Sequence, residues 1–334
     1  MNQVSVLGAG AWGTTLAQVL SDAGNEVILW ARDKQIVDEI NRHKTNQKYL
    51  GRHILPNSIR ATNSIEEVLS FSDFHVFAIP TQQLREQLID WHKFYNPAAT
   101  FVSTLKGIEL NSNLRVSEVV QEVWGDINFA VITGPNLADE LILRQPAGAV
   151  VASKNLSISE KVQLYFSANY YRVYTSTDVL GCELAGALKS VIALAVGISI
   201  GMNYGENTQA MMITRGLNEI ARLCARHGSD PLTAAGLAGM GDLVASCGSP
   251  LSRNRTFGEV LGRSGSLEIA KAQIAKTVEG VFTSRAALEL AHQVGVEVPI
   301  IEAVADVVEG LITPTQALQR LMEISTRAEN FLSD

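Results

Sequence analysis

The first half of the chain alternates short apolar runs with longer segments whose apolar residues repeat at helical spacing. The runs have the length of buried strands and end at turn residues. The predicted strands are Gln3–Leu7, Glu26–Trp30, Phe74–Ala78, Thr100–Ser103, Phe129–Thr133, Ala147–Ala152 and Arg172–Tyr174. The predicted helices are Leu16–Ala23, Gln35–Arg42, Thr81–Tyr95, Leu114–Val123 and Ser159–Phe166. This alternation predicts a mostly parallel sheet with helices on both faces.

After Asp178 the pattern changes to helical periodicity without clear strands. The predicted helical runs are Leu180–Ile200, Met211–His227, Leu267–Lys276, Thr283–Val294 and Thr315–Leu321. We therefore expect a sheet domain over residues 1–178 and an all-helical domain over residues 179–334, packed closely with a cleft between them.

One apolar stretch, Val179–Met202, is long enough to span a bilayer. It contains Glu183, Lys189 and several glycines, so its uninterrupted part is too short for a membrane span. We predict a buried helix in a soluble domain and no stable membrane insertion. The two ionisable residues inside it then need a structural or chemical reason.

The 334 residues are enough for two domains with substantial cores. A formal net charge of -7 gives no general attraction to nucleic acid or to an anionic membrane, so a site for an anionic substrate has to be made locally. The three cysteines form no C-x-x-C pair and the six histidines show no ligand spacing, so we predict neither disulfides nor a metal site. The first strand begins almost at Met1, which leaves no room for an export segment, and we expect a cytoplasmic protein.

The most informative motif directly follows the first predicted strand. Gly8, Gly10 and Gly13 form a G-x-G-x-x-G pattern that opens a helix. In dinucleotide-binding turns the first glycine permits a tight turn, the second lets the backbone approach the pyrophosphate, and the third lets the helix pack on its strand. The first domain is therefore predicted to be a doubly wound sheet of the Rossmann type.

The cofactor's ribose is predicted to lie at the end of the second strand. A carboxylate for the 2′-hydroxyl is expected about twenty residues beyond the glycines, and Arg32 stands there, followed by Asp33. A guanidinium pairs well with a 2′-phosphate, so NADP(H) should be accepted, while Asp33 keeps NAD(H) open.

Three further segments carry candidate chemistry. Lys106 follows a strand of the predicted nucleotide-binding domain, Lys189 lies inside an apolar helix behind small residues, and Asp242 follows two glycines. Hydride reduction of a ketone places negative charge on its oxygen, and a lysine meets that need as cation or proton donor. Ser252-Arg253-Asn254 precedes a predicted helical run, Arg255–Leu261, and is a good cradle for phosphate.

In this order, the motifs resemble those of the NAD(P)-dependent sn-glycerol-3-phosphate dehydrogenase family. They are Gly8–Thr15, Lys106-Gly107, Gly134-Pro135, Gly186–Lys189, Ile213–Gly216, Gly241–Leu243 and Ser252–Arg255. The resemblance runs from about Val4 to Leu321. The family interconverts dihydroxyacetone phosphate and sn-glycerol 3-phosphate with NADP(H) or NAD(H), and in bacteria it supplies the backbone of phospholipids.

The resemblance implies roles for individual residues. Lys189 would exchange the proton, with Lys106 and Asp242 completing the catalytic set. The residues implied to contact the cofactor are Gly8, Gly10, Ala11, Trp12, Gly13, Arg32, Lys106, Ala138, Arg253 and Glu279. Those implied to contact the small phosphate substrate are Lys106, Gly134, Asn136, Lys189, Asp242, Ser252, Arg253 and Asn254. A homodimer is plausible for the family, although no interface is readable from the sequence.

The chain departs from the family pattern at three positions. Ala11 replaces a polar residue, Asn136 replaces Ser or Thr, and Ser190 replaces Asn. Asn136 and Ser190 keep hydrogen-bonding capacity, and backbone amides can cover the loss at Ala11. We therefore expect retuned binding and retained activity.

Two alternative functions stay open at this stage. The same layout suits another reductase, such as a 6-phosphogluconate or hydroxyacid dehydrogenase, but Ser252–Arg255 argues against it. A nucleotide sensor without catalysis is the other alternative, and the presence of both Lys106 and Lys189 argues against that.

Overall fold

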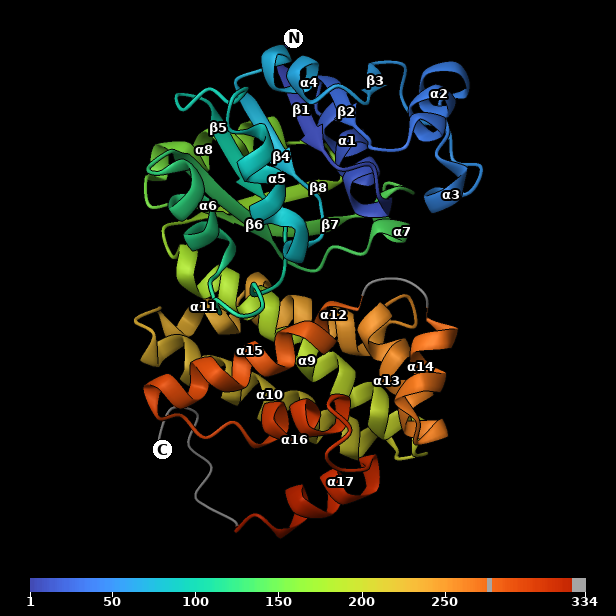
Figure 1. Cartoon of the computed structure of the whole chain (residues 1–334), viewed down its shortest axis with the longest axis vertical. Helices are drawn as coiled ribbons and strands as arrows, with labels where there is room; N and C mark the ends of the chain where they lie inside the picture. The colour runs from blue at the N-terminus through green and yellow to red at the C-terminus, as the bar shows by residue number, and fades with distance from the viewer. Residues whose placement is uncertain (275–277, 326–334) are drawn as a thin grey trace. The chain divides into compact units, whose positions relative to one another are not determined.

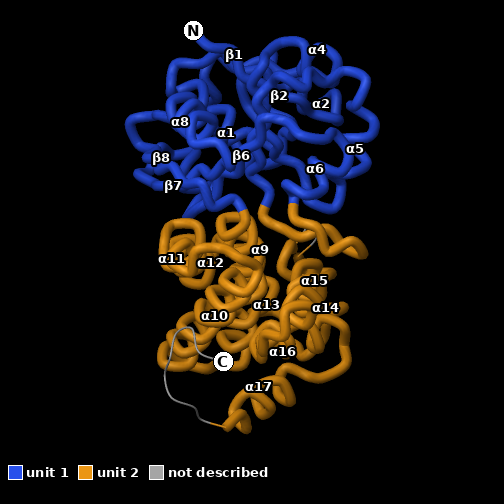
Figure 2. The backbone as a smooth tube through the Cα atoms, turned by 90° about the vertical axis from the view of Figure 1, so that its left-hand side faces the viewer, with its two compact units in different colours: residues 1–105, 116–179 blue, residues 106–115, 180–334 orange. Residues whose placement is uncertain are grey.

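The computed structural model describes residues 1–274 and 278–325, and the chain divides into two compact units (Figure 2). The first comprises residues 1–105 and 116–179, and the second comprises residues 106–115 and the chain from 180 onward. The sequence placed Lys106 in the nucleotide-binding domain. The structure assigns it to the second unit, because the segment Lys106–Arg115 leaves the sheet and makes its contacts with the helices.

The first unit is built on a sheet whose strands, within the described residues, follow the order β3-β2-β1-β4-β5-β6-β7-β8 (Figure 1). Its strands are β1 (Gln3–Leu7), β2 (Glu26–Trp30), β3 (Ile59–Thr62), β4 (Phe74–Phe77), β5 (Thr100–Ser103), β6 (Asn128–Thr133), β7 (Ala147–Ala152) and β8 (Tyr171–Ser176). The pair β6–β7 is antiparallel and the other pairs are parallel. The order through β6 is that of a Rossmann sheet, so the predicted fold class is confirmed.

Successive side chains of a strand point to opposite faces of the sheet. Both faces of this sheet are therefore buried, and helices cover each of them. Val4 and Val6 of β1 belong to one core cluster, whereas the hydroxyl of Ser5 between them donates to Val68 O on the opposite face. The helices of the unit are α1 (Ala11–Asp22), α2 (Lys34–His43), α3 (Gln47–Leu50), α4 (Ile65–Phe71), α5 (Leu84–Trp91), α6 (Val116–Trp124), α7 (Ala138–Leu141) and α8 (Leu156–Tyr165), with a 3₁₀ turn, η1 (Thr81–Gln83).

Some predicted bounds in this unit were wrong. The sequence missed β3 and α4, because β3 is four residues long and carries a charged Arg60. The helix predicted from Leu114 begins at Val116. Leu114 and Arg115 are instead used to close a turn, in which Leu114 O accepts from Glu109 N and Arg115 bridges to Ile108.

The described part of the second unit is helical apart from that short bridge, as predicted. Its elements are α9 (Val179–Gly201), α10 (Glu206–Arg226), α11 (Pro231–Ala235), the π-helical turn η2 (Leu237–Gly241), α12 (Asp242–Gly248), α13 (Arg253–Ser264), α14 (Leu267–Gln273), α15 (Glu279–Val294), α16 (Pro299–Val308) and α17 (Pro314–Glu323). The helix predicted up to Lys276 ends at Gln273, and Lys276 itself lies outside the described residues.

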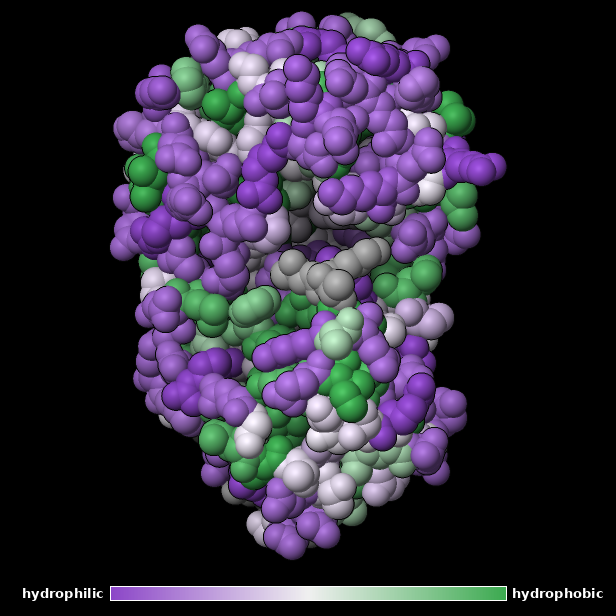
Figure 3. All heavy atoms as spheres, turned by 45° about the vertical axis from the view of Figure 1, so that its right-hand side comes forward, coloured by the Kyte–Doolittle hydropathy of each residue, from purple (hydrophilic) through white to green (hydrophobic). Residues whose placement is uncertain are grey.

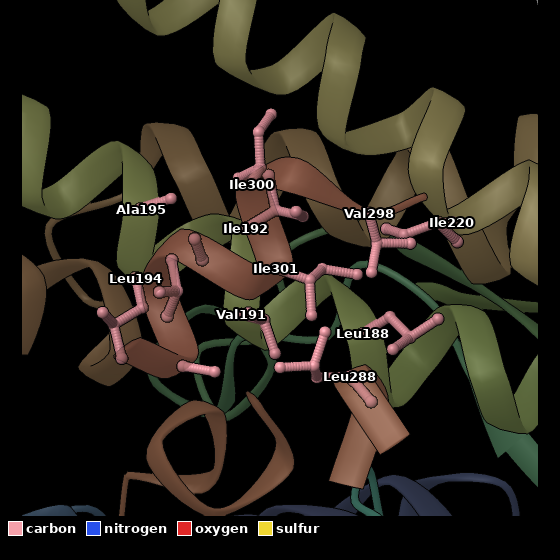
Figure 4. Packing of buried hydrophobic residues seen from close by; sticks show 14 of the residues in the cluster. Leu188, Val191, Ile192, Leu194, Ala195, Ile220, Leu288, Val298, Ile300 and Ile301 are labelled. Carbon is pink, nitrogen blue, oxygen red and sulfur yellow. The ribbon is translucent and has the colours of Figure 1, made fainter. Parts of the chain in front are cut away.

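Helix α9 is the core of the second unit (Figure 4). Leu188, Val191 and Ile192 pack among side chains of the surrounding helices, including Ile220 of α10, Leu288 of α15 and Ile301 of α16. The helix is long and apolar enough to cross a membrane, but 89% of its most apolar window is buried inside the protein. It is therefore a core helix, as the sequence predicted.

Two helices approach α9 so closely that only glycine fits at the contacts. A Cβ on Gly197 would collide with Arg255 O of α13, and one on Gly258 of α13 would collide with Leu194 O. Gly216 of α10 lies against the Ile192 side chain in the same way. The Ile213–Gly216 motif therefore has a packing role, and the glycines of α9 fix the start of α13.

Outside this core, hydrophobic surface residues gather over the second unit on the face in Figure 3.

Candidate active site

The glycine turn lies at the carboxyl edge of the sheet, between β1 and β4, where the strand order reverses. Such a switch point is where doubly wound sheets bind ligands. Gly8 has a φ of +125°, and a Cβ there would collide with Ala78 O just after β4. A Cβ on Gly13 would collide with Gly8 O. Gly8 and Gly13 are thus required by the fold of the turn itself.

Gly10 differs, because a Cβ at this position would meet nothing within 4 Å. It forms the N-cap of α1 without a side-chain cap, and the first turn contains no acidic residue. The first N–H groups of a helix have no acceptor within the helix, so the start of α1 and the open space at Gly10 suit the pyrophosphate of a dinucleotide. Ala11 and Trp12 are half-buried, and Trp12 packs against the core of the first unit.

At the end of β2, the two candidate ribose contacts have different surroundings. Asp33 Oδ1 accepts from Gln35 N at 2.9 Å as the N-cap of α2, and Oδ2 lies 3.6 Å from Lys48 Nζ. Arg32 is exposed. The carboxylate is therefore used locally, and the guanidinium is the more accessible group.

Three other predicted contacts follow β6 in the first unit. Gly134 has a φ of +143°, and a Cβ there would lie 2.9 Å from Gly148 O. The Asn136 Oδ1 atom is buried without a hydrogen-bond partner. Ala138 begins α7, and its carbonyl accepts from Thr15 Oγ1 of α1 at 3.5 Å.

In the second unit, Asp242 brings both predicted lysines together. Asp242 Oδ2 pairs with Lys106 Nζ, and Oδ1 lies 3.1 Å from Lys189 Nζ. The Lys189 ammonium also donates to Ser246 Oγ at 2.6 Å. We refer to Lys106, Lys189, Asp242 and Ser246 as the Lys–Asp–Lys cluster. The side chain of Asp242 is 3% exposed, while those of Lys106 and Lys189 are 18% and 12% exposed.

The local fold explains how Asp242 reaches this position. It begins α12 directly after the π-helical turn η2, in which Gly241 N donates to Gly236 O. Such π-turns are frequent at functional sites. Ser246 lies one helical turn further, on the same face of α12. The sequence analysis missed Ser246, although its i+4 spacing from Asp242 is a readable signal.

The environment of the cluster shifts the pKa values of Lys106 and Asp242. Burial lowers the pKa of Lys106 to about 8, and the Lys189 charge acts in the same direction, while Asp242 opposes them. Burial alone would raise the pKa of Asp242, but the two ammonium groups outweigh it and hold that pKa below its usual value. The carboxylate therefore stays ionised, and Lys106 titrates near pH 8.

The residues predicted to bind phosphate lie at the start of α13. Ser252 is the N-cap, and its hydroxyl accepts from Arg255 N at 3.4 Å. Arg253 is exposed. Asn254 Oδ1 accepts from Gly280 N at 2.9 Å, which joins the start of α13 to the start of α15, where Glu279 is the first residue. The predicted site residues of the second unit therefore lie in two groups. One group is the Lys–Asp–Lys cluster, and the other lies at the starts of α13 and α15.

A dinucleotide turn on a Rossmann sheet and a buried carboxylate between two lysines define an NAD(P)-dependent oxidoreductase. Two family models match the chain: the NAD-dependent glycerol-3-phosphate dehydrogenase N-terminus over residues 3–159 and the C-terminus over residues 178–319.

Individual relatives agree with the family models. The chain is 47% identical over 329 residues to glycerol-3-phosphate dehydrogenase [NAD(P)+] of Streptomyces avermitilis, covering 98% of each chain. It is 49% identical over 332 residues to the enzyme of the same name from Corynebacterium glutamicum, covering 98% of this chain and all of that one. A crystal structure of glycerol-3-phosphate dehydrogenase from Coxiella burnetii is 33% identical with a TM-score of 0.92, covering 96% of this chain and 99% of that one.

The chain belongs to the NAD-dependent glycerol-3-phosphate dehydrogenase family. The predicted family, enzyme class and cofactor type are confirmed.

Proposed function

We propose that this chain catalyses the reversible reduction of dihydroxyacetone phosphate to sn-glycerol 3-phosphate, with the Lys–Asp–Lys cluster as its catalytic centre. The observation that carries the proposal is the pairing of one buried carboxylate with two lysines that the sequence had singled out separately. NAD(P)H, when bound, supplies the hydride.

The cluster deals with the charge that the reaction creates on the substrate's ketone oxygen. Lys189 donates a proton to that oxygen in reduction and accepts it in oxidation. Lys106 adds a second positive charge that stabilises the developing alkoxide. Asp242 keeps both ammonium groups in place.

The phosphate of the substrate is assigned to the start of α13. Ser252, Arg253 and Asn254 supply a hydroxyl, a guanidinium and an amide Nδ2 next to helix N–H groups. Gly134 and Asn136 are further proposed substrate contacts, and the buried Asn136 Oδ1 has no hydrogen-bond partner within the protein.

The cofactor is assigned to the glycine turn of the first unit. Gly8 and Gly13 shape the turn, and Gly10 leaves the space that a pyrophosphate needs. The remaining proposed cofactor contacts are Ala11, Trp12, Arg32, Lys106, Ala138, Arg253 and Glu279.

We further propose that Arg32 binds the 2′-phosphate and makes NADPH the better cofactor, because Asp33 is engaged as a helix cap. Arg32→Ala should lower kcat/KM for NADPH about 10- to 100-fold, the value of a lost hydrogen bond to a charged group. The same change should leave kcat/KM for NADH nearly unchanged. Arg42→Ala, which removes an exposed arginine at the end of α2, is the matched control. Equal losses with both cofactors would contradict the assignment.

The cellular setting follows as part of the proposal. The enzyme would act in the cytoplasm, and its product would supply glycerophospholipid synthesis. A homodimer is the proposed assembly, tested by sedimentation.

The substrate is tested by following NADPH and NADH oxidation with dihydroxyacetone phosphate and with other keto substrates. We expect turnover with dihydroxyacetone phosphate, and far less with keto acids or an unphosphorylated ketone. Faster turnover of a keto acid would favour another reductase, and tight cofactor binding without turnover would favour a sensor.

A further inference from the structure

The segment Lys106–Arg115 is an excursion that interrupts the first unit and carries Lys106 to the cluster. It is closed on itself near its base. Ile108 and Arg115 form an antiparallel bridge, and Glu109 N donates to Leu114 O at 2.9 Å. The position of Lys106 therefore depends on how this small loop is anchored to the helices around it.

Several contacts, among them two polar ones, anchor the loop to the helices of the second unit. Arg115 Nη1 lies 2.7 Å from Glu183 Oε2 of α9, and Asn113 Nδ2 donates to Glu289 Oε2 of α15 at 2.6 Å. Ile108 is fully buried in the same core cluster as Leu184 of α9. Of the two polar anchors, the one to Glu183 is the more deeply buried, since that side chain is 4% exposed.

Glu183 lies on α9 six residues before Lys189, about 9 Å along the helix axis. The Arg115–Glu183 pair thus attaches the loop that carries one lysine of the cluster to the helix that carries the other. It also accounts for a charged residue in the apolar stretch of α9.

The Arg115–Glu183 ion pair is better explained as a device that positions the loop than as a contribution to the stability of the fold. Desolvation of two buried charges offsets most of their attraction, and a well-packed apolar pair often stabilises a fold equally well. Two charged groups with one preferred arrangement instead fix the loop in a single register against α9. We propose that Arg115 and Glu183 are positioning residues, which hold the Lys106 ammonium against Asp242 beside Lys189. This inference rests on the proposed role of Lys106 in catalysis.

The test is a double-mutant cycle between Glu183 and Lys106, read out as kcat with dihydroxyacetone phosphate. In the otherwise wild-type enzyme, Glu183→Gln should lower kcat about 10- to 100-fold, the scale of a displacement of about 1 Å. In a Lys106→Met background the same change should leave the residual kcat within about twofold, because the group it positions is gone. Because Lys106 is itself a proposed cofactor contact, the Kd for NADPH is measured in every variant, and Glu183→Gln should leave it unchanged in the Lys106→Met background.

The two ways of failing can be told apart. If Lys106→Met itself keeps near-normal turnover, the proposed catalytic role fails and this inference fails with it. If Lys106→Met is slow but Glu183→Gln lowers kcat by the same factor in both backgrounds, only the positioning role is overturned. A fall in Tm with kcat within twofold of wild type would also overturn it.

Further variants protect the test against misfolding. Arg115→Met combined with Glu183→Gln removes both charges and avoids an unpaired buried ion. This double variant should fold and should lose about as much kcat as the worse single variant. Glu183→Asp keeps the charge and should recover part of the loss, and an unrecovered rate in a folded Glu183→Asp protein would count against the pair. Arg320→Met, which breaks the exposed pair with Asp306, is the control and should leave kcat unchanged.

Discussion

The two units carry proposed functional groups of different kinds. In the first unit the cofactor turn consists of backbone: Gly8 and Gly13 are required because neighbouring backbone atoms leave no room for a side chain. In the second unit the cluster consists of charged side chains on separate elements, with one buried carboxylate between two lysines. A backbone site tolerates a change such as Ala11 in its side chains. A charge cluster has no such tolerance, since the loss of one charged member leaves a buried partner without its counter-charge.

Asp242→Asn should have the largest effect of the variants that probe this contrast. It leaves two buried ammonium groups without their counter-charge, so we expect kcat to fall at least 10²–10³-fold and Tm to fall as well. The assay is NADPH oxidation with dihydroxyacetone phosphate, together with thermal unfolding. The control is Asp306→Asn, which removes the carboxylate that pairs with the half-exposed Arg320. This variant should leave kcat unchanged. A normal rate in Asp242→Asn would place the chemistry elsewhere.

The glycine turn should separate folding from binding. Gly13→Ala forces a Cβ into Gly8 O, so we expect a stability loss of about 1–3 kcal/mol as well as weak cofactor binding. Gly10→Ala has open space around it and should leave Tm nearly unchanged while it weakens NADPH binding. Thermal unfolding and fluorescence titration with NADPH measure both effects. Similar Tm values for the two variants would show that the turn is less constrained than its backbone contacts imply.

Above about pH 8, activity should fall with rising pH while the contribution of Lys106 to stability rises. Because the pKa of Lys106 is about 8, kcat/KM for reduction should be flat up to that pH and fall above it as the positive charge is lost. Between about pH 8 and the ordinary value of 10.5 the unfolded chain binds more protons at this residue than the folded chain. Lys106 should therefore add stability as pH rises through that window. A rate profile that is flat to pH 10 would contradict a catalytic charge on Lys106.

Much of the fold and most of the proposed site residues could be predicted from the sequence. Short apolar runs located β1 and β2, and helical periodicity located α9, because each depends mainly on its own residues. The missed β3 is too short, and too polar at Arg60, to give such a pattern. Lys106, Lys189 and Asp242 were identified by type and motif, yet their meeting at one carboxylate depends on tertiary packing.

The same reason explains what the sequence did not reveal about the cluster's support. Arg115 gives no local signal, since its partner Glu183 is 68 residues away. The assignment of Lys106 to the second unit also follows from contacts of the loop with α9 and α15 rather than from its position after β5.

The most direct test of the division of labour between the two units is Lys189→Ala, with kcat measured at saturating NADPH and dihydroxyacetone phosphate alongside the Kd for NADPH. The account predicts that kcat falls about 10²–10³-fold while the Kd for NADPH stays unchanged. Near-normal turnover in this variant would contradict it.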